Sequence, residues 1–109
     1  MFAITQNNKQ MRRFMKKLVI REWAKASVVF SDVRTDVIDR CRRSPCSIKD
    51  LAEQLGLNPG TIFNHVKKLH EAGFLEVVQT RKVRGIEEKK YAPTADHFDM
   101  SELATEDLP

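Results

Sequence analysis

The chain has 109 residues, of which 41% are hydrophobic and 31% charged, and its formal net charge is +4 at pH 7. This length predicts a single domain, and the apolar fraction is sufficient for a small core, which excludes disorder as the default state. No apolar run approaches the roughly 18 residues of a membrane span. The basic residues near the N-terminus alternate with apolar ones, so we expect no signal peptide. Two cysteines exclude a disulfide scaffold and predict a cytoplasmic location.

The charge is unevenly distributed along the chain. All 19 Lys and Arg residues and 10 of the 15 acids lie within residues 1–90, whereas five acids and no Lys or Arg follow Thr94. A basic body of this size favours an anionic partner, with nucleic acid ahead of an anionic membrane surface.

The first predicted element is an amphipathic helix over residues 9–27, within an N-terminal segment 1–29. Its apolar stripe falls on one helical face, opposite a basic one. We expect a dimerisation element, with a basic arm flanking DNA and a membrane-surface helix as alternatives. The residues predicted to form the dimer contact are Met11, Phe14, Met15, Leu18 and Val19.

Three further helices are predicted, over about 32–43, 48–55 and 59–72. Ser47 is placed to cap the second of these helices in a variant of the capping box. Gly56 is placed to end it, because glycine adopts the left-handed conformation that stops a helix.

Two strands are predicted next, over 74–80 and 86–92, from their β-branched and aromatic content. They flank a basic, glycine-bearing loop at 81–85. A short helix capped by Thr94 and an acidic tail are expected to complete the chain, over 94–109.

The spacing of Ala52, Gly56 and Ile62 is typical of two helices that cross at a steep angle through a short turn. Asn58 and Pro59 are suited to the cap and first position of the second helix. The predicted fold is therefore mainly α with a small β-hairpin. It is a winged helix-turn-helix, in which residues 30–93 supply a tri-helical core and a two-stranded wing, with an extra N-terminal amphipathic helix.

From about residue 30 to 98 the chain resembles the ArsR-like winged-helix regulators. The residues that carry the resemblance are Ser31-Asp32-Val33-Arg34, Ser47-Ile48-Lys49-Asp50-Leu51-Ala52-Glu53, Thr61 to Gly73, and Arg84-Gly85-Ile86-Glu87-Glu88-Lys89-Lys90-Tyr91 with Thr94-Ala95. The resemblance implies a homodimeric transcription factor that reads a short inverted repeat. Metal-sensing relatives carry a Cys-x-Cys pair where this chain has Ser47 and Lys49, so their metal sensing is not carried over.

We predict that double-stranded DNA contacts three parts of this fold. The recognition helix would bring base-reading and phosphate-binding groups to the major groove, and the basic wing would contact phosphates or the minor groove. Phe63 is interpreted either as a thymine-methyl contact or as part of a dimer or core surface. The predicted contacts are Pro59, Gly60, Thr61, Phe63, Asn64, Lys67 and Lys68 on the recognition helix, Ser47 and Lys49 at the start of the preceding helix, and Arg81, Lys82, Arg84 and Gly85 in the wing.

The sequence predicts no metal site, cofactor or catalytic group, and assigns no effector. Cys41 and Cys46 are expected to be free, partly buried thiols, because no paired metal-ligand spacing supports them. His65 is expected to pack as a hydrogen-bonded core histidine, whereas His70 and His97 are expected on the surface.

The preferred interpretation is a homodimeric transcriptional repressor that is not an enzyme. One alternative is a plasmid or phage adaptor that binds centromere or replication DNA through the same fold. The other is a winged helix that serves protein–protein contacts.

Overall fold

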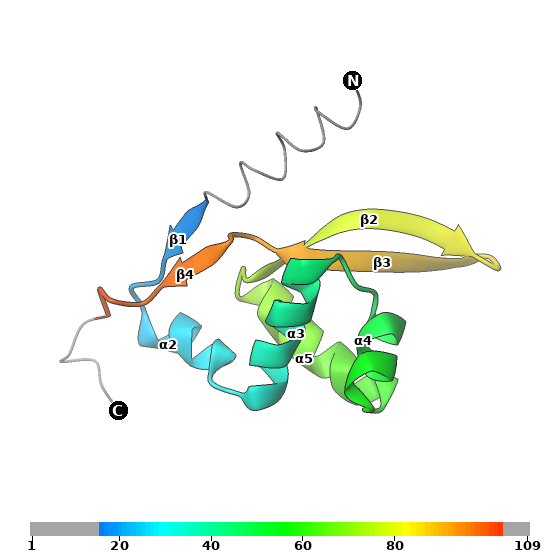
Figure 1. Cartoon of the computed structure of the whole chain (residues 1–109), viewed down its shortest axis with the longest axis horizontal. Helices are drawn as coiled ribbons and strands as arrows, with labels where there is room; N and C mark the ends of the chain where they lie inside the picture. Colours follow the sequence, from blue (N-terminus) through cyan, green and yellow to red (C-terminus); the bar gives the residue numbers. More distant parts are fainter. Residues whose placement is uncertain (1–15, 104–109) are drawn as a thin grey trace, which may run out of the picture.

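The computed structural model describes residues 16–103. Figure 1 shows helices α3, α4 and α5 gathered beneath the long hairpin of β2 and β3, with β1 and β4 side by side at the opposite end of the molecule. This arrangement confirms the predicted winged helix-turn-helix. The elements in chain order are β1 (Lys17–Val19), α2 (Trp23–Ala26), the 3-10 helix η1 (Ser27–Val29), α3 (Asp32–Arg43), α4 (Ile48–Leu55), α5 (Pro59–Glu71), β2 (Leu75–Val83), β3 (Ile86–Pro93) and β4 (His97–Asp99).

The three core helices begin and end close to the predicted residues because their caps are local. Ser31 Oγ accepts from the backbone N–H of Arg34 at 3.4 Å at the start of α3. Ser47 and Asp50 form a reciprocal capping box at the start of α4, with both hydrogen bonds at 3.0 Å. Gly56 ends α4 in the left-handed conformation, with a φ of 66°.

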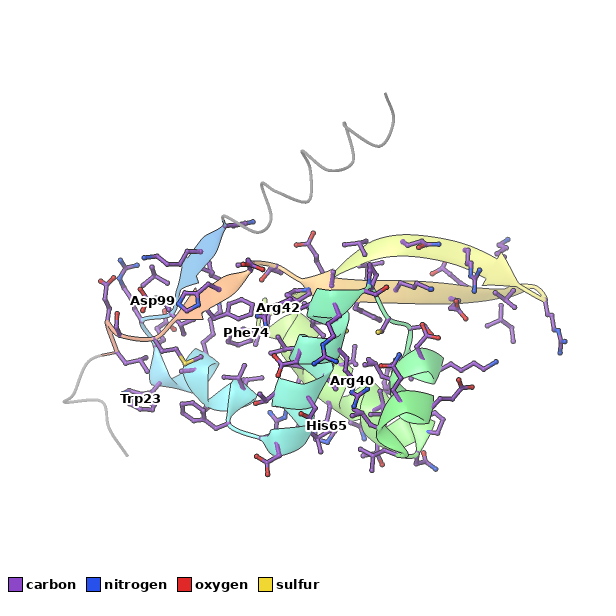
Figure 2. The ribbon with its side chains drawn as sticks, in the orientation of Figure 1. Trp23, Arg40, Arg42, His65, Phe74 and Asp99 are labelled. Carbon is purple, nitrogen blue, oxygen red and sulfur yellow. The ribbon has the colours of Figure 1, made fainter. Side chains whose placement is uncertain are left out.

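The core joins these helices to both pairs of strands. Phe74 lies three residues after the end of α5 and is completely buried, and Figure 2 places it between the helices and β4. Its ring packs edge-on against Phe98 of β4, with centroids 5.0 Å apart. Phe74 therefore links the recognition helix, the wing and the terminal strands. The other large, fully buried side chains are Ile20, Val37, Cys41, Leu51, Ile62, Val66, Leu69 and Leu75.

The hairpin is longer than predicted. β2 and β3 pair antiparallel from Leu75–Pro93 to Val83–Ile86, which leaves only Arg84 and Gly85 in the turn. Both turn residues have positive φ, 54° and 79°. Two such residues give a turn whose twist matches that of the strands, so pairing continues to the tip. The predicted basic loop at 81–85 is therefore wrong in its extent.

The helix predicted over 9–27 is wrong where it can be compared. Within the described residues 16–27 of this segment, residues 17–19 form β1, parallel to β4, and helical turns begin only at Trp23. Ile20 is buried, and its N–H donates to the Asp99 carbonyl at 2.8 Å. The apolar periodicity of residues 9–27 predicted a helix because a periodicity within one segment carries no information about a partner strand at the other end of the chain. Residues 9–15 of the predicted helix lie outside the described residues.

The short helix expected after Thr94 is replaced by β4. The Thr94 hydroxyl donates to the Gly73 carbonyl at 2.7 Å, and its N–H donates to the Phe74 carbonyl at 3.0 Å. Thr94 thus ties the end of the wing to the end of α5 instead of capping a helix. Over residues 16–103, no helix has the length and apolarity needed to cross a membrane.

Candidate nucleic-acid interface

Helices α4 and α5 form the predicted helix-turn-helix. Ala52 on α4 is 7% exposed and Ile62 on α5 is fully buried, so the two helices pack closely, as the spacing predicted. The Leu57 N–H donates to the Ala52 carbonyl at 3.1 Å within the turn. Asn58 then caps α5, its Oδ1 accepting from the Gly60 N–H at 2.7 Å.

The outer face of α5 is free of side-chain partners within the part of the chain that the structure describes. Asn64, Lys67 and Lys68 are exposed, and no hydrogen bond or ion pair within residues 16–103 holds their side chains. The opposite face is buried, which fixes the rotation of the helix. The outer face can therefore bind an external ligand without first breaking an internal contact. The buried residues of α5 are Ile62, Val66 and Leu69.

The remaining predicted α5 contacts are also exposed: Pro59, Gly60, Thr61 and Phe63. Phe63 is 50% exposed, which rules out its assignment to the core. A Cβ at Gly60 would lie only 3.1 Å from the Asn58 Oδ1 cap. Because residues 59–61 are exposed, the first turn of α5 is open to solvent, where amide groups and the helix dipole favour an anion.

The two residues predicted to contact DNA at the start of α4 differ in exposure. Ser47 is 2% exposed, and its Oγ accepts from the Asp50 N–H, so this side chain serves as a helix cap. Lys49 is exposed. The pKa of Asp50 is lowered mainly because its carboxylate accepts a hydrogen bond from the Ser47 backbone N–H. The Ser47 hydroxyl and the charge of Lys90 lower this pKa further.

The wing brings its predicted cations together, but part of their charge is paired. Arg81 and Lys82 lie in β2, whereas Arg84 and Gly85 form the turn. Arg81 Nε donates to Glu88 Oε1 across the hairpin at 3.1 Å. Within the described part of the chain, Lys82 and Arg84 make no ion pair.

Two features of the wing were missed from the sequence. Its tip is apolar as well as basic, because Ile86 is 72% exposed and Val83 40% exposed. The pair could have been found by reading Arg84-Gly85 as a two-residue turn, which places these two residues opposite each other.

The second missed feature is the attachment of the wing to the helix-turn-helix. Cys46 and Tyr91 exchange two backbone hydrogen bonds, of 3.1 and 2.8 Å. Lys90 Nζ lies 3.8 Å from Asp50 Oδ2 at the start of α4. These contacts join residues far apart in sequence and have no local signal.

His65 differs in one respect from its prediction. It is half-buried on the inner side of α5, but its buried Nδ1 has no hydrogen-bond partner in residues 16–103. Burial lowers its pKa, and the positive charges of Arg34 and Lys68 lower it further. His70 and His97 are exposed, as predicted.

Cys41 and Cys46 are free and buried. Burial is the main cause that raises the pKa of Cys41 to about 12, and it also raises the pKa of Cys46. Burial therefore disfavours the thiolate form of both cysteines. Among residues 16–103, no three His, Cys, Asp or Glu side chains are grouped to hold a metal ion.

The residues predicted for dimerisation do not form one helical stripe. Leu18 and Val19 are half-buried in β1, and Met11, Phe14 and Met15 lie outside the described residues. A different apolar surface lies beside α2, where Phe30 is 60% exposed and its ring centroid lies 6.0 Å from that of Trp23.

Comparison with known proteins supports this fold. Residues 33–77 match the model of the arsR family of bacterial regulatory proteins. Among solved structures, the chain is similar to reduced HlyU from Vibrio cholerae, with 14% identity, a TM-score of 0.53, and 87% of this chain and 83% of HlyU covered. It is also similar to NolR from Sinorhizobium fredii, with 16% identity, a TM-score of 0.53, and coverage of 86% and 78%. No curated protein matches the sequence significantly.

Proposed function

We propose that this chain is a homodimeric transcriptional repressor of the ArsR type, which reads a short inverted repeat in double-stranded DNA; the match of residues 33–77 to the arsR family model supports this. The observation that carries the proposal is the outer face of α5. Asn64, Lys67 and Lys68 are exposed and have no side-chain partner among residues 16–103, on the helix that enters the major groove in this fold.

The chemistry of that face suits DNA. An asparagine can pair with an adenine edge, and lysines bind phosphates or guanine. Lys82 and Arg84 on the wing, without ion pairs in residues 16–103, are suited to phosphate oxygens beside the same groove. We propose that α5 reads bases and the wing contacts the backbone.

The test is selection of binding sites from random duplex DNA by the full chain, followed by affinity measurements over a range of salt concentrations. We expect an enriched inverted repeat. Lys67→Ala should reduce the steepness of log K against log salt by about 1.8 per dimer, the value for one phosphate contact in each of the two subunits. The matched control is Arg21→Ala, which removes one charge from a residue paired with Glu102 at 3.3 Å, away from α5. An unchanged slope for Lys67→Ala contradicts the proposal.

The dimer is tested separately. We propose that the exposed Phe30 surface beside α2 takes part in it, since an exposed aromatic cluster is typical of an interface. Phe30→Asp should sediment as a folded monomer and bind DNA more weakly, whereas Ile86→Asp, an equally drastic change at the wing tip, should leave the dimer intact. A Phe30→Asp variant that remains dimeric overturns this assignment.

The exposed pair Val83 and Ile86 favours a second candidate, a winged helix that binds another protein through an apolar tip. Failure of the full chain to bind any duplex DNA at low salt would support this candidate. Genome-wide mapping that places binding at tandem clustered repeats near a partition or replication gene, in place of one inverted repeat over a promoter, would instead support a centromere-binding or replication adaptor.

A further inference from the structure

A cavity of about 420 Å³ lies between η1, α3 and β4. None of its lining residues belongs to α4, α5 or the wing, so it is separate from the proposed DNA interface. Its volume is within the range of cavities that hold small organic molecules.

One part of the lining is apolar and held in place by the core. Ile38 is only 6% exposed, and Phe98 is held edge-on against Phe74, with ring centroids 5.0 Å apart. A ligand with one aromatic or aliphatic ring would bury apolar surface against residues that are already ordered. The apolar lining residues are Val29, Ile38, Phe98 and Met100.

Most polar groups of the lining are already engaged. The Thr35 hydroxyl donates to the Val29 carbonyl at 3.1 Å. Arg42 and Asp39 form an ion pair at 3.0 Å, so their charges offset each other. These groups give the cavity polar edges but little net charge.

Asp96 is different. Its backbone N–H donates to the Lys16 carbonyl at 3.0 Å, which fixes its place in the wall. Its carboxylate makes no hydrogen bond or ion pair within residues 16–103. Among the described residues, the lining therefore includes one carboxylate without an ion-pair partner beside an apolar wall, which complements a cation and repels an anion.

From this combination we infer that the cavity binds a small organic cation, with a body of one ring and a primary ammonium group that pairs with Asp96. This inference goes beyond the proposed function. Because its test uses no DNA, failure of cavity binding and failure of DNA binding can be distinguished.

The test is to titrate the full chain at neutral pH with three probes of similar shape and different charge. Binding is monitored in amide ¹H–¹⁵N spectra. 2-Phenylethylamine should give saturable shifts in the amides of α3 and β4. 2-Phenylethanol should bind about tenfold more weakly, as expected for the loss of one charge-assisted hydrogen bond. Phenylacetate should bind more weakly still.

Asp96→Asn should reduce the affinity for the amine to that for the alcohol. The matched control is Asp36→Asn, which removes the same charge from an exposed α3 residue that does not line the cavity. Equal binding of the amine and the alcohol by the wild-type chain overturns the inference, as does preferential binding of phenylacetate. A saturable response confined to amides outside α3 and β4, or no saturable response, overturns it as well. The probe comparison needs only the wild-type chain, so the result does not depend on the folding of a variant.

Discussion

The recognition helix and the wing both present basic side chains, but they hold them in different ways. Lys67 and Lys68 on α5 have no ion-pair partner in the described part of the chain. On the hairpin, Arg81 pairs with Glu88 at 3.1 Å and Lys90 lies 3.8 Å from Asp50.

The reason lies in the backbone of each element. A helix satisfies its hydrogen bonds internally and is held by its buried face, which leaves the opposite side chains free. A two-stranded ribbon is marginal alone and is supported by cross-strand side-chain pairs. A count of basic residues therefore describes the binding capacity of α5 better than that of the wing.

The largest expected effect is at the residue that supports both regions. Phe74→Ala should reduce the free energy of unfolding by about 3–5 kcal/mol, because it removes a fully buried ring that packs against Phe98. Urea denaturation measures this change. Val78→Ala, at a position 37% exposed on β2, is the control and should have a much smaller effect. A midpoint close to wild type for Phe74→Ala would show that the wing and α5 do not depend on a shared support.

The next effect distinguishes base reading from phosphate binding on α5. Asn64→Ala should weaken binding to the selected site by about 1–3 kcal/mol and relax the preference at one base pair. Lys67→Ala should weaken binding to all sequences alike. Affinities for the site and its single-base variants measure both. Equal, sequence-independent losses would mean that α5 is rotated relative to the groove.

A smaller effect is expected at the joint between the helix-turn-helix and the wing. Asp50→Asn should reduce the free energy of unfolding by about 0.3–1 kcal/mol at pH 7, because a charge is lost at the start of α4. The folded-state pKa of Asp50 is lowered, so its contribution is present above the unfolded value near 3.9 and is lost as the pH falls through the folded value. Unfolding followed from pH 7 to strongly acid pH should show the two proteins converge below pH 4. A constant difference would contradict this account.

The smallest effect is expected from the paired cation of the wing. The double change Arg81→Ala and Glu88→Ala removes a neutral pair, so DNA affinity and its salt dependence should remain close to wild type. Stability should change by at most about 1 kcal/mol. Arg84→Ala, which removes a cation without an ion pair in residues 16–103, is the comparison and should weaken binding. A salt slope reduced by about two per dimer in the double variant, one phosphate contact from each subunit, would show that Arg81 leaves Glu88 to bind a phosphate.

Patterns along the chain were enough to predict α3, α4 and α5, the turn at Gly56 and the rotation of the recognition helix. Each depends on residues close together in the chain: Ser47 caps with Asp50, and Ile62, Val66 and Leu69 define one face. Local hydrogen bonds and a helical period can be predicted from such short stretches of sequence.

Contacts between distant segments set the pairing of β1 with β4, the burial of Ile20, the ion pair of Arg81 and the backbone pairing of Cys46 with Tyr91. The partners of β1 lie at the other end of the chain, so Leu18 and Val19 fit a helical stripe equally well until that strand is present. Which cations stay free depends likewise on what the fold brings opposite them. A strand pair or an ion pair needs two segments in contact, and the separation of those segments along the chain carries no local pattern.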